Sequence, residues 1–220
     1  MRMDLNTHIF HHCRHMSKSP LYSNDLSLSP HSKSIPYAAD RLREPGRAVN
    51  YGFKNLKIKP SLIETIPELE EDPGLKALIE MVNRKDSCFF TVGCASDTVQ
   101  IAGGHCRKGY LEFAWNCASC VQDAINYFAL YFHFNKSLVV KSFNQPVQLK
   151  WIIQEAAFSD VETHGFSCVV HIETLPLSSL EQANQAWQLT LRMIDAYLST
   201  VETLQPMPIY QPLSEYSHER

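Results

Sequence analysis

The chain has 220 residues, of which 45% are hydrophobic and 20% charged, and its formal net charge is −3. This composition supplies enough apolar side chains for one globular core, and the length fits one domain with an extension. No run reaches the roughly 18 apolar residues of a membrane helix, so we expect no membrane span. The first residues lack the apolar segment of a secretory signal, which predicts a cytoplasmic protein.

The first 60 residues differ from the rest in charge and composition. They carry ten Lys or Arg against four Asp or Glu, whereas residues 61–220 carry ten against nineteen. Serines and prolines are frequent in this stretch, and such a segment buries too little apolar surface to offset the entropy lost on ordering. We therefore predict a disordered basic leader over 1–60. The leader could contact a polyanion, whereas the acidic remainder disfavours nucleic-acid binding by the domain itself.

The domain is expected to span 61–205 and to begin with a helix and three strands. Asp72-Pro73 offers an N-cap followed by proline at the first helical position, and apolar residues at helical spacing predict a helix over 73–84. Three β-rich runs follow, with a polar turn between the first two and Gly103-Gly104 before the third. These runs are Cys88–Gly93, Thr98–Ala102 and Lys108–Trp115.

A second helix is expected to follow Asn116, and its apolar surface is unusually broad. The stripe predicted to face the core consists of Val121, Ala124, Ile125, Phe128 and Phe132. Four further residues widen it beyond what one sheet face can cover, and these are Tyr127, Leu130, Tyr131 and Phe134. An apolar surface of this width predicts contact with a partner as well as with the sheet. We take the four widening residues as the candidate interaction surface.

The rest of the chain predicts a hairpin and a long closing helix. Val147–Phe158 and Phe166–Leu175 alternate as strands around a polar turn. The last helix is expected from about Ser179 to Leu204, with Ser178 and Glu181 at capping-box spacing. Residues 206–220 are predicted to form a loose C-terminal tail.

Together these elements predict an α+β fold. In the order α-β-β-β-α-β-β-α, an antiparallel sheet of about five strands with helices mainly on one face would bury every apolar stripe. Stacking the helices on the sheet in this way is expected to leave no polar cleft equipped for a reaction.

The order of elements between 73 and 204 resembles the type III secretion chaperone-like fold. That resemblance implies a dimeric protein-binding module without catalysis, in a bacterial protein. It rests on element order, and no functional residue is carried over by it.

The pair Cys117 and Cys120 is the sharpest local motif. It lies where a strand is expected to give way to a helix, and a helix N-terminus lowers the pKa of a nearby thiol. A Cys-x-x-Cys after an aromatic residue is similar to the active site of the thioredoxin family, which implies thiol-redox chemistry at these two residues.

Two other interpretations of the cysteines remain open. Cys94, Cys106, Cys117 and Cys120, with His105 nearby, would form a structural zinc site if four of these ligands met in tetrahedral geometry. Alternatively, the cysteines pack as small apolar side chains, without a cofactor. The sequence contains no Gly-rich phosphate loop, Gly-x-Ser-x-Gly elbow or His-Glu-x-x-His motif. We therefore favour a non-catalytic protein-interaction or chaperone-like module that binds a protein partner or a second copy, with thiol-redox or zinc chemistry as the alternative.

Overall fold

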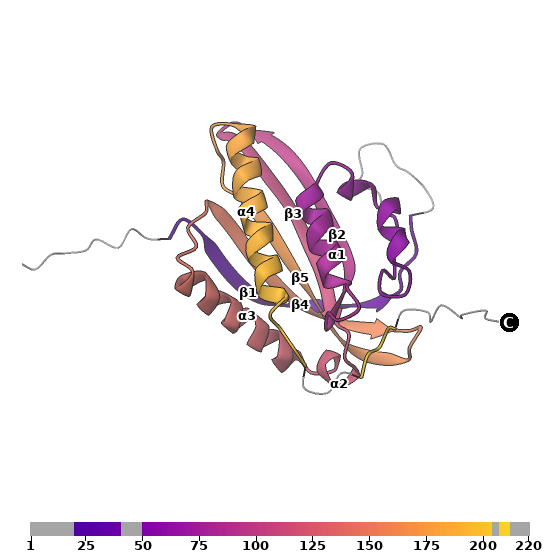
Figure 1. Ribbon diagram of the computed structural model, residues 1–220. Helices are drawn as coiled ribbons and strands as arrows, with labels where there is room; N and C mark the ends of the chain where they lie inside the picture. Colours follow the sequence, from indigo (N-terminus) through magenta and orange to yellow (C-terminus); the bar gives the residue numbers. More distant parts are fainter. Residues whose placement is uncertain (1–19, 41–49, 204–206, 212–220) are drawn as a thin grey trace, which may run out of the picture.

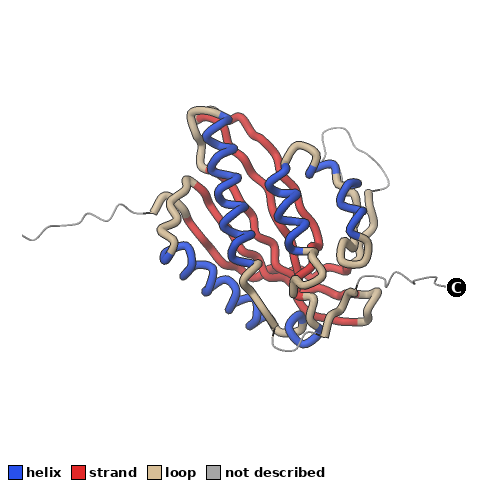
Figure 2. The backbone as a smooth tube through the Cα atoms, viewed as in Figure 1, coloured by secondary structure: helices blue, strands red, loops and turns tan. Residues whose placement is uncertain are grey.

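The structure is a computed structural model that describes residues 20–40, 50–203 and 207–211. Figure 1 shows a curved sheet with helices lying across one face, and Figure 2 shows the same arrangement by type of element. The strands are β1 (Ser23–Ile35), β2 (Phe89–Ile101), β3 (Gly104–Trp115), β4 (Val147–Phe158) and β5 (Thr163–Thr174). The helices are the 3-10 turns η1 (Pro60–Thr65) and η2 (Pro67–Leu69) and the α-helices α1 (Pro73–Val82), α2 (Ala118–Val121), α3 (Ala124–Val140) and α4 (Leu180–Leu198).

The predicted α+β class with a sheet of five strands is confirmed. The strands lie in the order β1-β4-β5-β3-β2, and the pairs β4–β5, β5–β3 and β3–β2 are antiparallel. The sheet is nevertheless mixed, because β1 pairs in parallel with β4. The helices α1, α3 and α4 cover the same face of the sheet (Figure 1), so the prediction of helices mainly on one face also holds.

The fifth strand comes from a segment that was predicted to be disordered. Residues 23–35 form β1, so the prediction of disorder throughout 1–60 is wrong for this stretch. Local composition gives this segment few apolar side chains, but pairing with β4 satisfies its backbone groups, and Ile35 is buried in the core. Residues 1–19 and 41–49 of the predicted leader lie outside the described residues.

The two runs predicted as separate strands before Gly103 form one long strand. β2 pairs with β3 from Phe89↔Trp115 to Ile101↔Gly104, and the polar residues 95–97 continue the ladder instead of turning. A register shift between Thr91 and Gly93 marks a bulge in β2. The hairpin turn lies at 102–103, where Gly104 adopts the left-handed backbone that only glycine takes readily.

The sheet curls so that its two edge strands approach each other at one end. The edges are β1 and β2, yet the Tyr37 hydroxyl, two residues after β1, donates to the Val92 carbonyl of β2 at 2.8 Å. Residues 50–56 follow this connection, and the Phe53 N–H donates to the Tyr37 carbonyl. The curl encloses space between the end of β1, residues 50–56 and the strands β2 and β3.

Asp72 joins three elements on the helix-covered side. Its side chain caps α1 by accepting from the Leu75 N–H, as predicted, and it is 1% exposed. The same carboxylate accepts from Arg107 Nη2 of β3 at 2.5 Å and from Trp187 Nε1 of α4 at 2.7 Å. A buried carboxylate is stable only with such partners.

The end of the chain is partly packed rather than loose. Tyr210 is 3% exposed, its N–H donates to Asn116 Oδ1, and its hydroxyl donates to Asp160 Oδ1. The predicted loose tail is therefore wrong for residues 207–211, whereas 212–220 lie outside the described residues. Asn116, expected to cap a helix, instead holds this segment through its side-chain amide. None of the helices in the described part of the chain is long and apolar enough to cross a membrane.

We expect Asp72→Ala to lower the free energy of unfolding by about 3–5 kcal/mol, because Arg107 and the Trp187 N–H lose their buried partner. Urea unfolding followed by tryptophan fluorescence measures this change. The control Glu64→Gln removes the solvent-exposed ion pair with Lys76 and should have a much smaller effect. Equal effects of the two substitutions would contradict the role given to Asp72.

Candidate functional site

A pocket of about 720 Å³ lies beside the bulge of β2, at the curled end of the sheet. Its walls come from the end of β1, residues 50–56, η2, α1 and the strands β2 and β3. Its ionisable lining includes Lys33, Tyr37, Glu68, Cys94, Tyr110 and Glu112. The helices and sheet therefore do leave a pocket with polar lining, which strand patterns in the domain alone did not predict because β1 forms part of its wall.

The centre of the pocket's polar floor is the buried carboxylate of Glu112, which is 4% exposed. Lys33 Nζ donates to both carboxylate oxygens, at 2.9 and 2.7 Å. Gln154 Nε2 and Ser167 Oγ donate to Oε1 at 2.9 and 2.8 Å. The four hydrogen bonds and the opposite charge of Lys33 make this group an electrically neutral, satisfied unit.

Two tyrosines of the pocket lie close to Gly93. A Cβ atom on Gly93 would lie 3.0 Å from the Tyr37 hydroxyl and 3.6 Å from that of Tyr110. Burial raises the pKa of Tyr110 to about 12, with Glu112 adding to the effect, and burial likewise raises the pKa of Tyr37. Both phenols are therefore protonated hydrogen-bond donors at neutral pH.

The thiol in the pocket is also uncharged. Burial, and to a smaller extent the nearby Glu68 and Asp72, raises the pKa of Cys94 to about 12. A nucleophilic cysteine needs a lowered pKa. The phenols and the thiol are protonated at neutral pH and the Glu112 carboxylate is paired, so these four groups are not poised for proton transfer.

The four residues predicted as an interaction surface face inward. Tyr127 and Phe134 are fully buried, Leu130 is 4% exposed, and Tyr131 is half-buried against Trp151. The prediction of a contact surface is wrong for Tyr127, Leu130 and Phe134, because the fold buries these three side chains. The reason is that α3 is apolar on nearly all sides, so spacing does not fix its rotation, and the Tyr127 hydroxyl turns inward to accept from the Trp115 N–H and donate to the Phe166 carbonyl.

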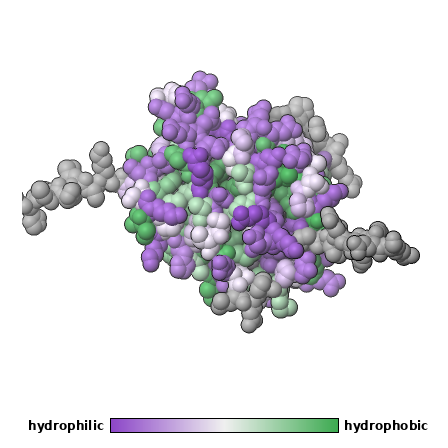
Figure 3. Space-filling model, in the orientation of Figure 1, coloured by the Kyte–Doolittle hydropathy of each residue, from purple (hydrophilic) through white to green (hydrophobic). Residues whose placement is uncertain are grey.

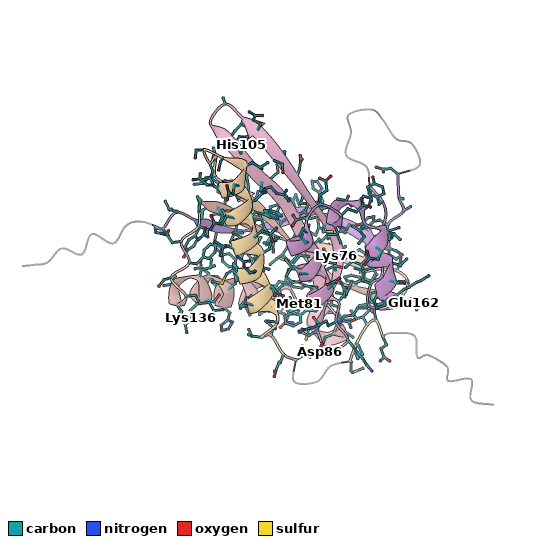
Figure 4. All side chains as sticks on the ribbon, turned by 45° about the horizontal axis from the view of Figure 1, so that its top comes forward. Lys76, Met81, Asp86, His105, Lys136 and Glu162 are labelled. Carbon is teal, nitrogen blue, oxygen red and sulfur yellow. The ribbon has the colours of Figure 1, made fainter. Side chains whose placement is uncertain are left out.

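The apolar residues that α3 does expose lie on its opposite side. Ile125 is 66% exposed, Phe132 64%, Val139 66% and Val140 73%. Two of them, Ile125 and Phe132, had been assigned to the core. In Figure 3 apolar side chains reach the surface at the lower left, over α3, and Lys136 marks the solvent side of this helix in Figure 4. We call Ile125, Phe132, Val139 and Val140 the α3 stripe.

Cys117 and Cys120 lie next to each other. The pKa of Cys117 is lowered, but the main cause is not the helix N-terminus that was expected. Cys117 precedes the four-residue helix α2. Burial acts to raise the pKa of Cys117, but hydrogen bonds with the side chains of Cys120 and Ser119 and with the N–H groups of Cys120 and Met207 lower it below its ordinary value. Burial and the neighbouring Cys117 raise the pKa of Cys120 to about 11.

The four cysteines of the zinc hypothesis do not meet. Cys106 and Cys117 lie eleven residues apart along or just beyond β3, which separates them by roughly 30 Å or more. Among the residues that the structure describes, no group of three or more His, Cys, Asp or Glu side chains is arranged to hold a metal ion.

The ion pair between Lys33 and Glu112 was not predicted from the sequence. Glu112 lies on the polar face of a strand and has the pattern of a solvent-exposed residue. The signal that was available is the alternation of Leu26 and Leu28 with serines in the leader, which is typical of a strand.

Compared with protein-family models, with curated proteins and with solved structures, the chain shows no significant match. The arguments about function therefore rest on this chain's own geometry.

Because the Cys94 thiol stays protonated in the fold, we expect stability to fall at alkaline pH. Its pKa is about 12 in the fold against 9.0 ordinarily, so above pH 9 the unfolded chain loses this proton first and the contribution disappears as pH rises towards 12. At pH 10.5 the loss amounts to about 2 kcal/mol from this group. Cys94→Ser should reduce the fall in unfolding free energy between about pH 8 and 10.5, measured by urea titration under reducing conditions. Parallel curves for the two proteins would contradict this assignment.

Proposed function

We propose that the protein is a non-catalytic interaction module whose α3 stripe binds a second copy of the chain. The observation that carries the proposal is the exposure of four large apolar side chains on one side of α3. Contiguous apolar surface on a soluble domain is typical of a protein-binding site, because leaving it in water costs about 25 cal/mol per Å².

The spacing of the stripe favours a two-fold symmetric partner. Three stripe residues are spaced seven residues apart: Ile125, Phe132 and Val139. Their arrangement is therefore nearly the same in either direction along the helix. Two α3 helices packed antiparallel would place Phe132 against its own copy on the axis. Ile125 of one copy would then face Val139 of the other, as an isologous interface requires.

The resemblance of the element order to the type III secretion chaperone-like fold implies the same class of function, a dimeric protein-binding module. On this proposal the protein acts in the bacterial cytoplasm and binds protein rather than nucleic acid.

We expect Phe132→Ser to raise the dissociation constant of the dimer at least tenfold. The substitution removes two aromatic side chains from the axis at once, and each contributes about 1.5–3 kcal/mol when buried. Light scattering after gel filtration over a range of protein concentrations measures the change. The control Ile101→Ser replaces an exposed apolar residue at the tip of the β2–β3 hairpin and should leave the mass unchanged. A wild-type protein that stays monomeric at all concentrations would contradict self-association.

Thiol-redox chemistry at Cys117 and Cys120 is the second candidate, and the hydrogen bonds that lower the pKa of Cys117 favour it. In this reaction the Cys117 thiolate attacks one sulfur of an external disulfide such as oxidised glutathione, and the other half leaves as a thiolate. Cys120 then loses its proton and attacks Cys117, which expels the second half. Two electrons pass to the external disulfide, and a Cys117–Cys120 disulfide forms. The burial of Cys117, which is 1% exposed, is the reason this candidate comes second.

If this chemistry operates, Cys120→Ser should accumulate one glutathione per chain on Cys117 when treated with oxidised glutathione, because the resolving thiol is missing. Intact mass and peptide mapping measure the adduct. The fully buried Cys168 serves as an internal control and should stay unmodified. Absence of both the adduct in this variant and a disulfide in the wild type would remove the candidate.

A further inference from the structure

We propose that the pocket at the curled end of the sheet binds an uncharged small molecule that contains an aromatic ring. This site is separate from the α3 stripe, and the proposal stands whether or not the chain dimerises.

The dimensions and lining of the pocket suit a small molecule. Its volume of about 720 Å³ lies in the range typical of ligand sites, which is about 300–1,000 Å³. Leu56, Ile66, Ile79 and Val92 supply apolar lining. A few polar groups placed among such side chains are the usual composition of a site that orients a ligand.

The charges in the pocket favour an uncharged ligand. Lys33 and Lys54 balance Glu68 and Glu112 in the lining, and Lys33, Gln154 and Ser167 complete the hydrogen bonding of the Glu112 carboxylate. A ligand with a net charge would bring an uncompensated charge into a partly buried space, and that is costly.

The two tyrosines favour an aromatic ring. Gly93 has no side chain, so Tyr37 and Tyr110 lie close against the backbone of β2, where a Cβ atom would come within 3.0 Å of the Tyr37 hydroxyl. The Tyr110 hydroxyl has no hydrogen-bond partner among the described residues, so it is available to donate to an acceptor on the ligand. The Tyr37 hydroxyl already donates to Val92, which holds its ring in place. Aromatic rings prefer offset or edge-to-face contacts with such side chains.

Two dyes with the same ring system test the proposal on the full chain. N-phenyl-1-naphthylamine is uncharged, whereas 8-anilinonaphthalene-1-sulfonate carries a sulfonate. We expect the uncharged dye to bind with a stoichiometry of one per chain, measured by fluorescence titration, and the anionic dye to bind at least tenfold more weakly.

Substitutions that fill the pocket locate the dye. Gly93→Leu and, independently, Ala95→Leu should each weaken binding of the uncharged dye at least tenfold. The matched control Gly103→Leu adds the same side chain at the exposed hairpin turn and should change the affinity less than twofold. Thermal unfolding of each variant checks that the fold is retained, and two filling variants are used because one of them could fail to fold.

Phe132→Ser separates the pocket from the α3 stripe, and it should leave the affinity for the uncharged dye within twofold. Loss of dye binding in Phe132→Ser with no effect of either filling variant would overturn the proposal. Equal affinity for the two dyes would also overturn it, because the pocket would then not select against charge.

Discussion

The ion pair between Lys33 and Glu112 is the contact on which the shape of this protein depends. Glu112 lies on β3, and a carboxylate buried on a sheet face is costly unless an opposite charge and hydrogen bonds accompany it. The opposite charge comes from β1, although β4 and β5 lie between β1 and β3 in the sheet. The pair can form only if the sheet curls, and the curl also brings Tyr37 to the other edge strand. The strand from the basic leader thus closes one end of the sheet, and the pocket exists because of it.

The helix α3 poses a different physical problem. It is apolar on almost every side, so burying one side necessarily leaves apolar surface on the other. The side that packs inward is the one whose aromatic hydroxyl groups find partners: Tyr127 reaches β3 and β5, and Tyr131 donates to the Asn24 carbonyl of β1. The opposite side, which carries Phe132, has no comparable partner among the described residues. On the proposal made above, a second copy of the chain supplies one, and the near-symmetric spacing of the stripe supports that proposal.

The cysteines illustrate how one residue type acquires different chemistry from its surroundings. Burial is the main cause that raises the pKa of Cys94, Cys88 and Cys168, and it keeps these thiols protonated at neutral pH. At Cys117 burial acts in the same direction, but hydrogen bonds outweigh it. One of those bonds comes from the backbone of Met207, ninety residues further along the chain. The spacing of the Cys-x-x-Cys motif identifies the pair. The lowered pKa of Cys117 depends in part on the distant segment around Met207, which no sequence pattern near the motif indicates.

Local patterns in the sequence determined the elements whose signals lie within a few residues: the cap of α1 by Asp72, the bounds of β4, the hairpin turn before Gly104 and the amphipathic α4. They also determined the α+β class, because alternating and helical periodicities each require a matching layer to bury their apolar sides. The tertiary structure decided the rest: the recruitment of β1, the rotation of α3 and the pocket around Glu112. These depend on which distant groups satisfy a buried charge, a hydroxyl or an edge strand, and that is settled by contacts between residues tens of positions apart, where periodicity carries no information.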